Sequence, residues 1–262
     1  MTGPPITIGL TALLVAMALM VGAPSLLLRR HWTARFPRIA LTAWLIALLS
    51  GALAILVGLG CAIAAVSALS APRYRALTLD HALSGVGVTL AAFVLTSIAG
   101  AAGCAVLYRG VVGMTLRHRL RTALVPVGRR TTPVLVDSPQ AGAVSLPGRR
   151  PVILVSARLQ HELSPDELEA VVEHERGHLR QHHHLIRQIA DLQYHCLPGL
   201  PCARALERSV PLLIELAADD HAAQRCGPGT VATALRTLAR TNDDPAMTLR
   251  AERLERRLSP RG

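Results

Sequence analysis

The chain has 262 residues and a formal net charge of +11, and 51% of its residues are hydrophobic. This length allows one large domain or two small ones. Membrane topology and attraction to anionic lipid explain the positive charge more simply than nucleic acid does, so we expect no direct nucleic-acid partner.

Three apolar runs without charged residues lie in the N-terminal part of the chain, at residues 6–28, 41–69 and 86–108. A helix of about 20 residues, rising ~1.5 Å per residue, crosses the roughly 30 Å hydrocarbon core of a bilayer. The first run differs from a cleavable signal peptide, because it has no basic n-region and its apolar core is longer. We therefore predict that residues 1–109 form three transmembrane helices in a lipid bilayer.

The positions of the arginines predict the orientation of these helices. Four arginines lie between the first two runs and six lie between Arg109 and Arg130, whereas the loop between the second and third runs has two arginines and Asp80. Cytoplasmic loops are enriched in Arg and Lys. We therefore predict a multi-pass protein with its N-terminus outside, a basic juxtamembrane linker at residues 110–130, and everything after Tyr108 in the cytoplasm.

Residues 131–242 are predicted to form the cytosolic domain, which begins with short strands. The β-type runs at residues 134–136 and 152–155 are separated by turn residues, among them Gly142 and Pro147. We expect a small sheet packed on the helix that follows. In a peptidase, an edge strand of such a sheet can pair with an extended substrate, and a purely structural hairpin is the alternative.

The next segment carries signals for a helix that begins at Pro165. Ser164 can cap the N-terminus of this helix, and proline suits its first position. Glu167 lies where a carboxylate can reach back to the main-chain N–H of the cap.

This predicted helix contains the sequence His174-Glu175-Arg176-Gly177-His178. Because a helix has about 3.6 residues per turn, both imidazoles can bind one metal ion, whereas Glu175, rotated by about 100°, can reach a water on that ion. In a zinc hydrolase the metal lowers the pKa of its water to roughly 7, and the carboxylate takes the proton as water attacks a carbonyl. A chance match on a solvated helix is the alternative, so the prediction needs a third protein ligand.

Glu215 is the candidate for this third ligand. A second helix is predicted to start at residues 209–211 and to stop at Gly227-Pro228, with Glu215 and Asp219 one turn apart on a shared face. Asp219 could then accept the N–H of a ligand histidine, more favourably that of His174, and fix its tautomer. The alternative interpretation is that this segment is an acidic helix end whose carboxylates face water and bind no metal.

Together these residues predict one Zn²⁺ per chain, with Glu175 as the general base and His174, His178 and Glu215 as the ligands. His221 and Arg225, on the same helix as Glu215, are candidates for stabilising an oxyanion.

The remaining segments are predicted to play supporting roles. His182, His183 and His184 are interpreted as a solvated helix cap, although His182 could compete for the metal. Residues 185–197 are too short and too charged to span a membrane, and they are expected to pack against the core or the membrane surface. Residues 230–241 predict a closing helix, and residues 243–262 a charged, mobile tail. The five cysteines indicate no disulfide framework.

The order of three apolar runs, short strands, His174-Glu175-Arg176-Gly177-His178 and Glu215-Leu216-Ala217-Ala218-Asp219 resembles the BlaR/MecR family of membrane zinc peptidases, in its compact actinobacterial form. It is similar, more distantly, to the HtpX and CAAX-prenyl peptidases, and residues 143–148 and 163–168 also look like segments of those families. The likeness covers roughly residues 130–225. It implies a gluzincin-like fold with the zinc site described above, a bacterial cell membrane, and a cytosolic protein substrate that is cut within its chain.

The expected fold is a mostly α-helical membrane protein, in which three N-terminal transmembrane helices precede a cytosolic α+β zinc peptidase domain with a small sheet. A chain without lysine cannot contain the Ser-x-x-Lys acylating domain of the beta-lactam sensors, and we expect no further span after the peptidase domain. The predicted activity is a membrane-embedded zinc endopeptidase that cleaves a cytosolic or membrane protein, with a transcriptional repressor as a substrate by analogy. A quality-control protease for membrane proteins and a non-catalytic membrane receptor with structural zinc are the alternatives.

Overall fold

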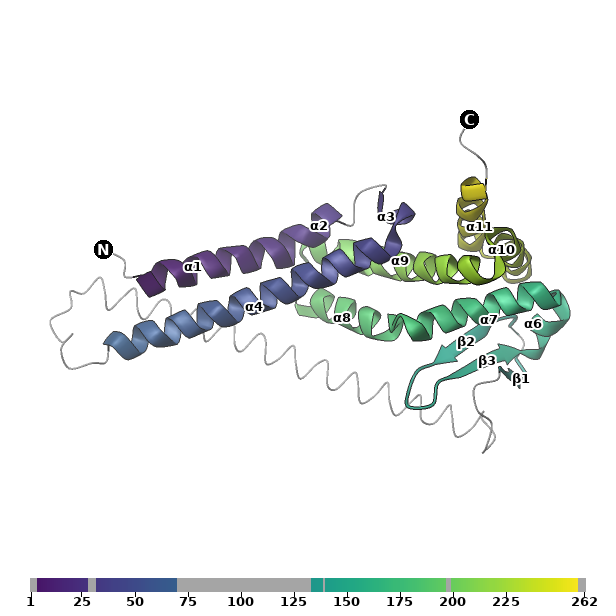
Figure 1. Cartoon of the computed structure of the whole chain (residues 1–262), viewed down its shortest axis with the longest axis horizontal. Helices are drawn as coiled ribbons and strands as arrows, with labels where there is room; N and C mark the ends of the chain where they lie inside the picture. Colours follow the sequence, from purple (N-terminus) through teal and green to yellow (C-terminus); the bar gives the residue numbers. More distant parts are fainter. Residues whose placement is uncertain (1–3, 28–31, 70–132, 139, 197–198, 259–262) are drawn as a thin grey trace. The chain divides into compact units, whose positions relative to one another are not determined.

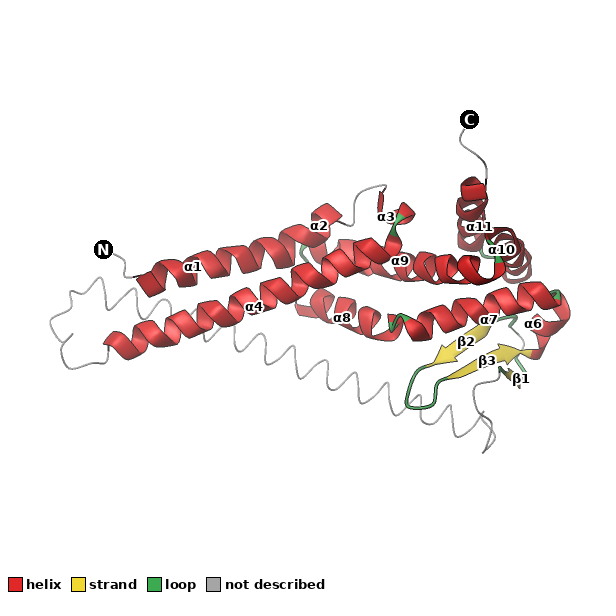
Figure 2. Cartoon of the chain, viewed as in Figure 1, coloured by secondary structure: helices red, strands yellow, loops and turns green. Residues whose placement is uncertain are grey.

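The computed structural model describes residues 4–27, 32–69, 133–138, 140–196 and 199–258 (Figure 1). These residues are mostly helical and include one three-stranded sheet (Figure 2). Internal contacts divide the chain into two compact units. The first unit consists of residues 1–108 and 190–209, and the second unit consists of residues 109–189 and 210–262.

The first unit is built on long apolar helices. Its first helical stretch consists of α1 (Pro4–Met17), the short π-helix η1 (Ala18–Gly22) and α2 (Ala23–Leu27). A four-residue helix, α3 (Trp32–Arg35), precedes the 33-residue helix α4 (Pro37–Leu69). Helices α1 and α4 pack along each other as a hairpin.

Two helical segments of the described residues, Thr7–Ser25 and Pro37–Cys61, are long and apolar enough to cross a membrane, by length and composition. They overlap the first two predicted spans, at residues 6–28 and 41–69. Such helices give weak support for a membrane protein, because a buried core helix or a signal sequence passes the same test. The third predicted span, at residues 86–108, and the predicted linker at residues 110–130 lie outside the described residues.

Helix α8 (His183–Cys196) covers the segment predicted to pack against the core or the membrane surface. Within the first unit, its buried Gln193 joins both apolar helices. The indole Nε1 of Trp44 donates to Gln193 Oε1 at 3.1 Å, and Gln193 Nε2 donates to the main-chain oxygen of Met20 at 2.8 Å. Met20 lies in η1, where the helical hydrogen-bond pattern shifts. The side-chain amide of Gln193 is therefore a hydrogen-bond partner for both this main-chain carbonyl and the indole N–H of Trp44.

The second unit begins with the sheet. The strands β1 (Val134–Val136) and β3 (Val152–Ser156) confirm the two predicted strands, and β2 (Ala143–Leu146) is an additional strand that sequence analysis did not predict. The order is β1-β3-β2, with β1 parallel and β2 antiparallel to β3. The antiparallel register pairs Ser145 with Ile153. Strand β2 is therefore an edge of this sheet.

Helix α7 (Pro165–Arg180) follows the short helix α6 (Ala157–Glu162) and confirms the predicted helix start. The Ser164 hydroxyl accepts from the N–H of Glu167, and the Glu167 carboxylate accepts from the N–H of Ser164, which completes the capping box. Strand β2 packs on α7. The local signals at the N-terminus thus place the metal-binding motif in the middle of a helix beside the sheet.

The second ligand helix is longer than predicted. The sequence predicts a start at residues 209–211, but α9 runs over Pro201–Cys226 with Pro211 inside it. A proline in a helix interior removes a hydrogen bond and crowds the preceding turn. Burial of neighbouring side chains offsets this cost, because Leu206 and Val210 are fully buried. The predicted end is confirmed at Gly227, whose φ of 85° suits glycine.

Residues 243–262 were predicted to form a mobile tail, but residues 243–258 of this segment are ordered, and residues 259–262 lie outside the described residues. After α10 (Pro228–Asn242), which confirms the predicted closing helix, residues Pro245–Leu258 form α11 and pack against α10. Ala251 and Leu254 of α11 are fully buried. Ion pairs connect α11 to α9 and α10, among them Arg253–Asp220, Arg257–Asp220 and Arg236–Glu255. The charges that suggested a solvated tail are thus paired with other helices.

Two apolar clusters form the core of the second unit. The first joins the sheet to α6, α7 and α10 and includes Ile153, Val155, Leu159, Leu163, Val172 and Leu238. The second joins α7, α9, α10 and α11 and includes Ala170, Ala222, Val231, Leu235 and Leu254. Met247 of α11 packs against both clusters.

Candidate metal centre

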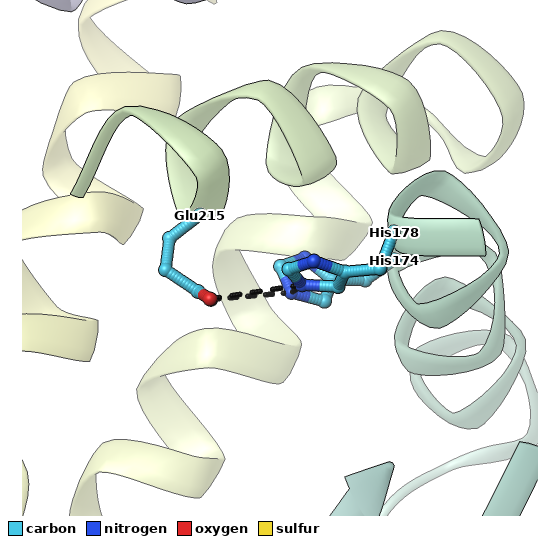
Figure 3. A group of neighbouring side chains, drawn as sticks. All are labelled: His174, His178 and Glu215. Atoms are coloured by element: carbon cyan, nitrogen blue, oxygen red, sulfur yellow. Dashed lines mark hydrogen bonds and ion pairs between the residues drawn. The ribbon is translucent and has the colours of Figure 1, made fainter. Parts of the chain in front are cut away.

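His174 and His178 of α7 and Glu215 of α9 point toward one another (Figure 3). The Nε2 atoms of the two histidines are 3.0 Å apart, and Glu215 oxygens lie 3.4 Å from the His174 Nε2 and 3.7 Å from the His178 Nε2. Two ligand atoms at tetrahedral positions around one zinc ion are roughly 3.3 Å apart, given zinc–ligand distances of about 2.0–2.1 Å. The donor types and their spacing therefore fit one zinc ion.

Gly177 allows α7 and α9 to approach each other closely. A Cβ atom at Gly177 would lie 3.1 Å from the Cβ of His221 and 3.3 Å from the Cα of Ala218, both on α9. Carbon atoms in favourable contact are about 3.5–4.0 Å apart. Because Glu215 also lies on α9, the glycine between Glu175 and His178 sets the distance from the carboxylate to the imidazoles.

We expect Gly177→Val to weaken zinc binding roughly 10- to 100-fold, the range seen for changes just outside a metal site. The branched side chain must displace α9, and Glu215 with it. Competition with a chromophoric chelator measures the affinity. Gly60→Val is the matched control, since Gly60 also lies inside a helix but has open space around its Cβ position. Equal zinc affinity in the two variants would contradict this role of Gly177.

Asp219 holds the ring of His174. Its carboxylate is fully buried, and Oδ1 lies 3.0 Å from Nδ1 of His174. A histidine that binds metal through Nε2 carries its proton on Nδ1, so this bond sets both the tautomer and the orientation of the ring. The expected preference of Asp219 for His174 agrees with this contact.

Arg250 of α11 is a site residue that sequence analysis missed. Its Nε and Nη2 donate to the two oxygens of Asp219 at 2.8 and 2.6 Å, and its Nη1 lies 3.1 Å from Oε2 of Glu215. Arg250 therefore balances a buried carboxylate and positions a candidate metal ligand. The spacing of Met247, Ala251 and Leu254 on one helical face was the signal that could have revealed an ordered helix here.

His183, at the start of α8, is a second residue that was missed. Its side chain is buried, and its Nδ1 lies 2.9 Å from Nδ1 of His178. With the Nε2 of His178 directed to the metal, the Nδ1–H of His178 donates to His183. His183 thus orients one ligand as Asp219 orients the other. The predicted solvated cap fits His182, which is exposed with a φ of 51°, but is wrong for His183.

Glu175 contacts the edge strand of the sheet. The hydroxyl and the main-chain N–H of Ser145 on β2 donate to its carboxylate. Burial raises the pKa of Glu175; the charge of His174 and the bonds from Ser145 oppose this, and the pKa stays above its usual value. A raised pKa suits a carboxylate that must accept a proton near neutral pH.

These side chains line a cavity of about 280 Å³. The metal-site residues that line it are His174, Glu175, His178, Glu215, Asp219 and Arg250, and residues 141–143, which lead into β2, line it as well. The cavity gives a substrate access to the three candidate ligands.

The two oxyanion candidates are not among the described residues that line this cavity. His221 Nε2 lies 3.5 Å from an oxygen of Glu173, and Arg225 is exposed. At about 100° per residue, they are rotated by roughly 240° and 280° from Glu215 around α9. His221 and Arg225 therefore lie on the same helix as Glu215, as the sequence predicted, but on a different side of that helix from Glu215.

With this geometry established, comparison with known proteins gives one finding. Residues 115–209 match the model of peptidase family M48. The matched region includes His174, Glu175 and His178 and ends before Glu215. The M48 match supports a metallopeptidase, a hydrolase of peptide bonds with a protein or peptide substrate, and M48 peptidases depend on zinc. Searches of curated proteins and of solved structures found no match.

The side chains of the candidate site have the charges that zinc binding needs, except at His174. Burial lowers the pKa of His174, but its bonds to Asp219 and Glu215 raise the pKa by a larger amount, so that it reaches about 9. Burial and the charge of His174 lower the pKa of His178 to about 4. Burial raises the pKa of Glu215, but His174 and Arg250 bring it down to about 2. Near neutral pH, therefore, His178 is neutral and Glu215 is ionised, but His174 is protonated.

Zinc must displace this proton from His174, so we expect about one proton to be released per zinc bound at pH 6. The apparent zinc affinity should then rise about tenfold per pH unit and level off above pH 9, where His174 is already neutral. Calorimetry in buffers of different ionisation enthalpy measures the released proton. Zinc binding without proton release at pH 6 would contradict a protonated His174.

Proposed function

We propose that the protein is a membrane-embedded zinc endopeptidase. The observation that carries this proposal is the meeting of His174, His178 and Glu215 beside the buried carboxylate of Glu175 in one cavity. A structural zinc site has four protein ligands and is closed, whereas a catalytic site has three ligands and an open position. Three ligands in an open cavity favour an enzyme over a receptor with structural zinc.

In the proposed reaction His174, His178 and Glu215 hold the zinc ion. When bound there, zinc supplies a Lewis acid that polarises the substrate carbonyl and makes water more acidic. Glu175 takes a proton from the attacking water and passes it to the leaving amine. Ser145 keeps the Glu175 carboxylate in place during both steps, while Asp219 and His183 hold the two rings.

The edge of β2 that faces away from β3 in the described sheet supports pairing with an extended substrate. Ser156 N–H donates to the oxygen of Gly142, so the main-chain groups of Gly142 face β3. Because residues of a strand alternate, those of Ala143 and Ser145 face the opposite edge. The Ser145 N–H already reaches Glu175, and Ala143 lines the cavity. A substrate strand at this edge would carry its scissile bond toward the zinc ligands.

The N-terminal segments support a location in a membrane. Of an 18-residue stretch in each of the two candidate spans, only 17% and 22% is buried, whereas a core helix of a soluble protein is mostly buried. We propose a multi-pass protein of a bacterial cell membrane, with the zinc domain in the cytoplasm on the basic side. The substrate is a cytosolic or membrane protein, either a repressor, as the resemblance to the BlaR/MecR family implies, or a misfolded membrane protein.

Metal removal tests the proposed activity. The full-length protein in detergent should cleave an unfolded protein such as reduced casein, lose this activity after dialysis against a chelator, and regain it with one equivalent of zinc. Fragments that arise within the casein chain identify an endopeptidase. A protein that binds one zinc and cleaves no peptide bond would instead be the non-catalytic receptor.

A further inference from the structure

The segment that leads into β2 is held by hydrogen bonds on both of its edges. On the edge that faces β3, Ser156 N–H donates to the oxygen of Gly142 at 2.9 Å, and the Ser156 hydroxyl accepts from the N–H of Gly142 at 3.0 Å. On the other edge, Nδ2 of Asn242, the last residue of α10, donates to the oxygen of Ala141 at 2.9 Å. Because residues of an extended chain alternate, Ala141 and Ala143 face this second edge together, where the proposed substrate strand would lie.

The second edge has few main-chain groups left for a substrate. The oxygen of Ala141 accepts from Asn242, and the N–H of Ser145 donates to Glu175. Ala143 lies between them, and its main chain forms no hydrogen bond across this edge to any residue that the structure describes. A substrate strand can therefore pair with Ala143, and two residues further along it meets the side chain of Asn242.

The bond to Ala141 determines how the amide of Asn242 is oriented. A carbonyl oxygen only accepts hydrogen bonds, so the NH₂ group of Asn242 must face Ala141, and Oδ1 faces elsewhere. Within the described part of the chain, no donor bonds to this Oδ1. The Asn242 side chain is exposed and lines the same cavity as His174 and Glu175. Asn242 thus brings a hydrogen-bond acceptor to the wall along which the substrate would lie.

We propose that Asn242 binds the main chain of the substrate. Its Oδ1 accepts a main-chain N–H of the extended peptide, while its Nδ2 remains bonded to Ala141. The amide stands where a paired strand would donate to Ala141, and it offers the substrate an acceptor in place of that carbonyl. The proposal rests on the proposed function, because it needs a peptide along β2. Such a contact is independent of the substrate side chains, but it disfavours proline at one position, since proline has no N–H.

Ester substitution in a bound peptide tests this contact. The probe is the peptide acetyl-Ala-Ala-Leu-Phe-Ala-Ala-amide, with a series of analogues in which one main-chain N–H at a time is replaced by an ester oxygen. The zinc-loaded full-length Glu175→Gln protein binds these peptides without cleaving them. We expect the ester to weaken binding roughly 5- to 20-fold at alternate positions, where the peptide N–H faces β2 or Asn242. Calorimetry measures the affinities.

Asn242→Ala, added to this protein, identifies the position that contacts the side chain. The ester penalty should disappear at one sensitive position and persist at the position, two residues away, that pairs with Ala143. If Asn242 only holds Ala141 in place, the substitution weakens all the peptides alike and every penalty persists. Asn242→Asp keeps an acceptor but cannot donate to Ala141, so it should retain the penalty that Asn242→Ala loses.

Thr241→Ala is the matched control. It removes a hydrogen bond of 2.7 Å to Glu162 from the same end of α10, and Thr241 is not among the described residues that line the cavity. The pattern of ester penalties should therefore be unchanged. Zinc content, measured on each preparation, should stay at one per chain in all variants, because Asn242 and Thr241 form no bond to the candidate zinc ligands within the described residues.

The same ester penalties in the proteins with and without Asn242→Ala, or no binding of the parent peptide, would overturn the proposal. If Asn242→Ala binds no peptide, Asn242→Asp decides: a retained penalty supports the contact, and a lost penalty overturns it. The outcome for the proposed function is separate. If one ester penalty depends on Asn242 but the unmodified zinc-loaded protein cleaves nothing, the endopeptidase activity is wrong and the main-chain contact stands.

Discussion

Glu175→Gln should bind zinc with unchanged affinity and lose peptide cleavage by about 10²- to 10⁴-fold, the usual contribution of a general base. Glutamine has the size of glutamate, and its amide oxygen can still accept from Ser145, so the cavity keeps its shape. The amide cannot accept a proton from water, however. Zinc content and cleavage of a quenched fluorescent peptide, measured on the same preparation, separate metal binding from catalysis.

Glu169→Gln is the matched control for this prediction. Glu169 lies on the same helix, and its carboxylate bonds to Arg176 at the surface. The substitution removes one negative charge from α7 without changing the cavity, so cleavage should be unaffected. If Glu175→Gln cleaves as fast as Glu169→Gln, another group takes the proton and the assigned role of Glu175 is wrong.

The parts of the structure that sequence analysis predicted correctly depend on short-range signals. The capping box at Ser164 and Glu167 and the one-turn spacing of His174 and His178 are determined within α7 itself. The same holds for the one-turn spacing of Glu215 and Asp219 in α9. Such patterns place side chains on a common face whatever surrounds the helix.

The residues missed by sequence analysis act through contacts between distant segments. Arg250 follows Asp219 by 31 residues, and its segment was interpreted by its charge as a mobile tail. Its acidic partners lie on α9, and only the packed structure shows that they neutralise it. His183 was grouped with its neighbours as a solvated cap, but the turn at His182 directs it back toward His178.

Strand β2 and the start of α9 were missed for a different physical reason. Strand β2 has four residues, too few for an alternating pattern to be decisive, and it is stabilised by pairing with β3 and contact with α7. Pro211 is a favourable first residue of a helix, so it predicted a helix start. Burial of Leu206 and Val210 outweighs this local preference and continues α9 through the proline.

Arg250→Ala should cause the largest loss of stability, and weaken zinc binding as well. It leaves the fully buried Asp219 carboxylate without its two hydrogen bonds from the guanidinium, and removing one partner of such a buried pair costs roughly 3–5 kcal/mol. Glu215 loses its contact with Nη1 at the same time, so zinc affinity should fall roughly 10- to 100-fold. Thermal unfolding and chelator competition measure the two effects.

Two further variants separate the charge of Arg250 from its geometry. Arg236→Ala removes an arginine that also forms two bonds to a carboxylate, that of Glu255, but this pair is exposed and should matter little. Adding Asp219→Asn to Arg250→Ala removes the buried negative charge that has lost its guanidinium partner, so stability should partly return. Zinc affinity should stay low, because an asparagine holds the ring of His174 less firmly than a carboxylate and Glu215 remains unsupported. If Arg250→Ala behaves like Arg236→Ala in both measurements, α11 is a covering helix that contributes nothing to the metal centre.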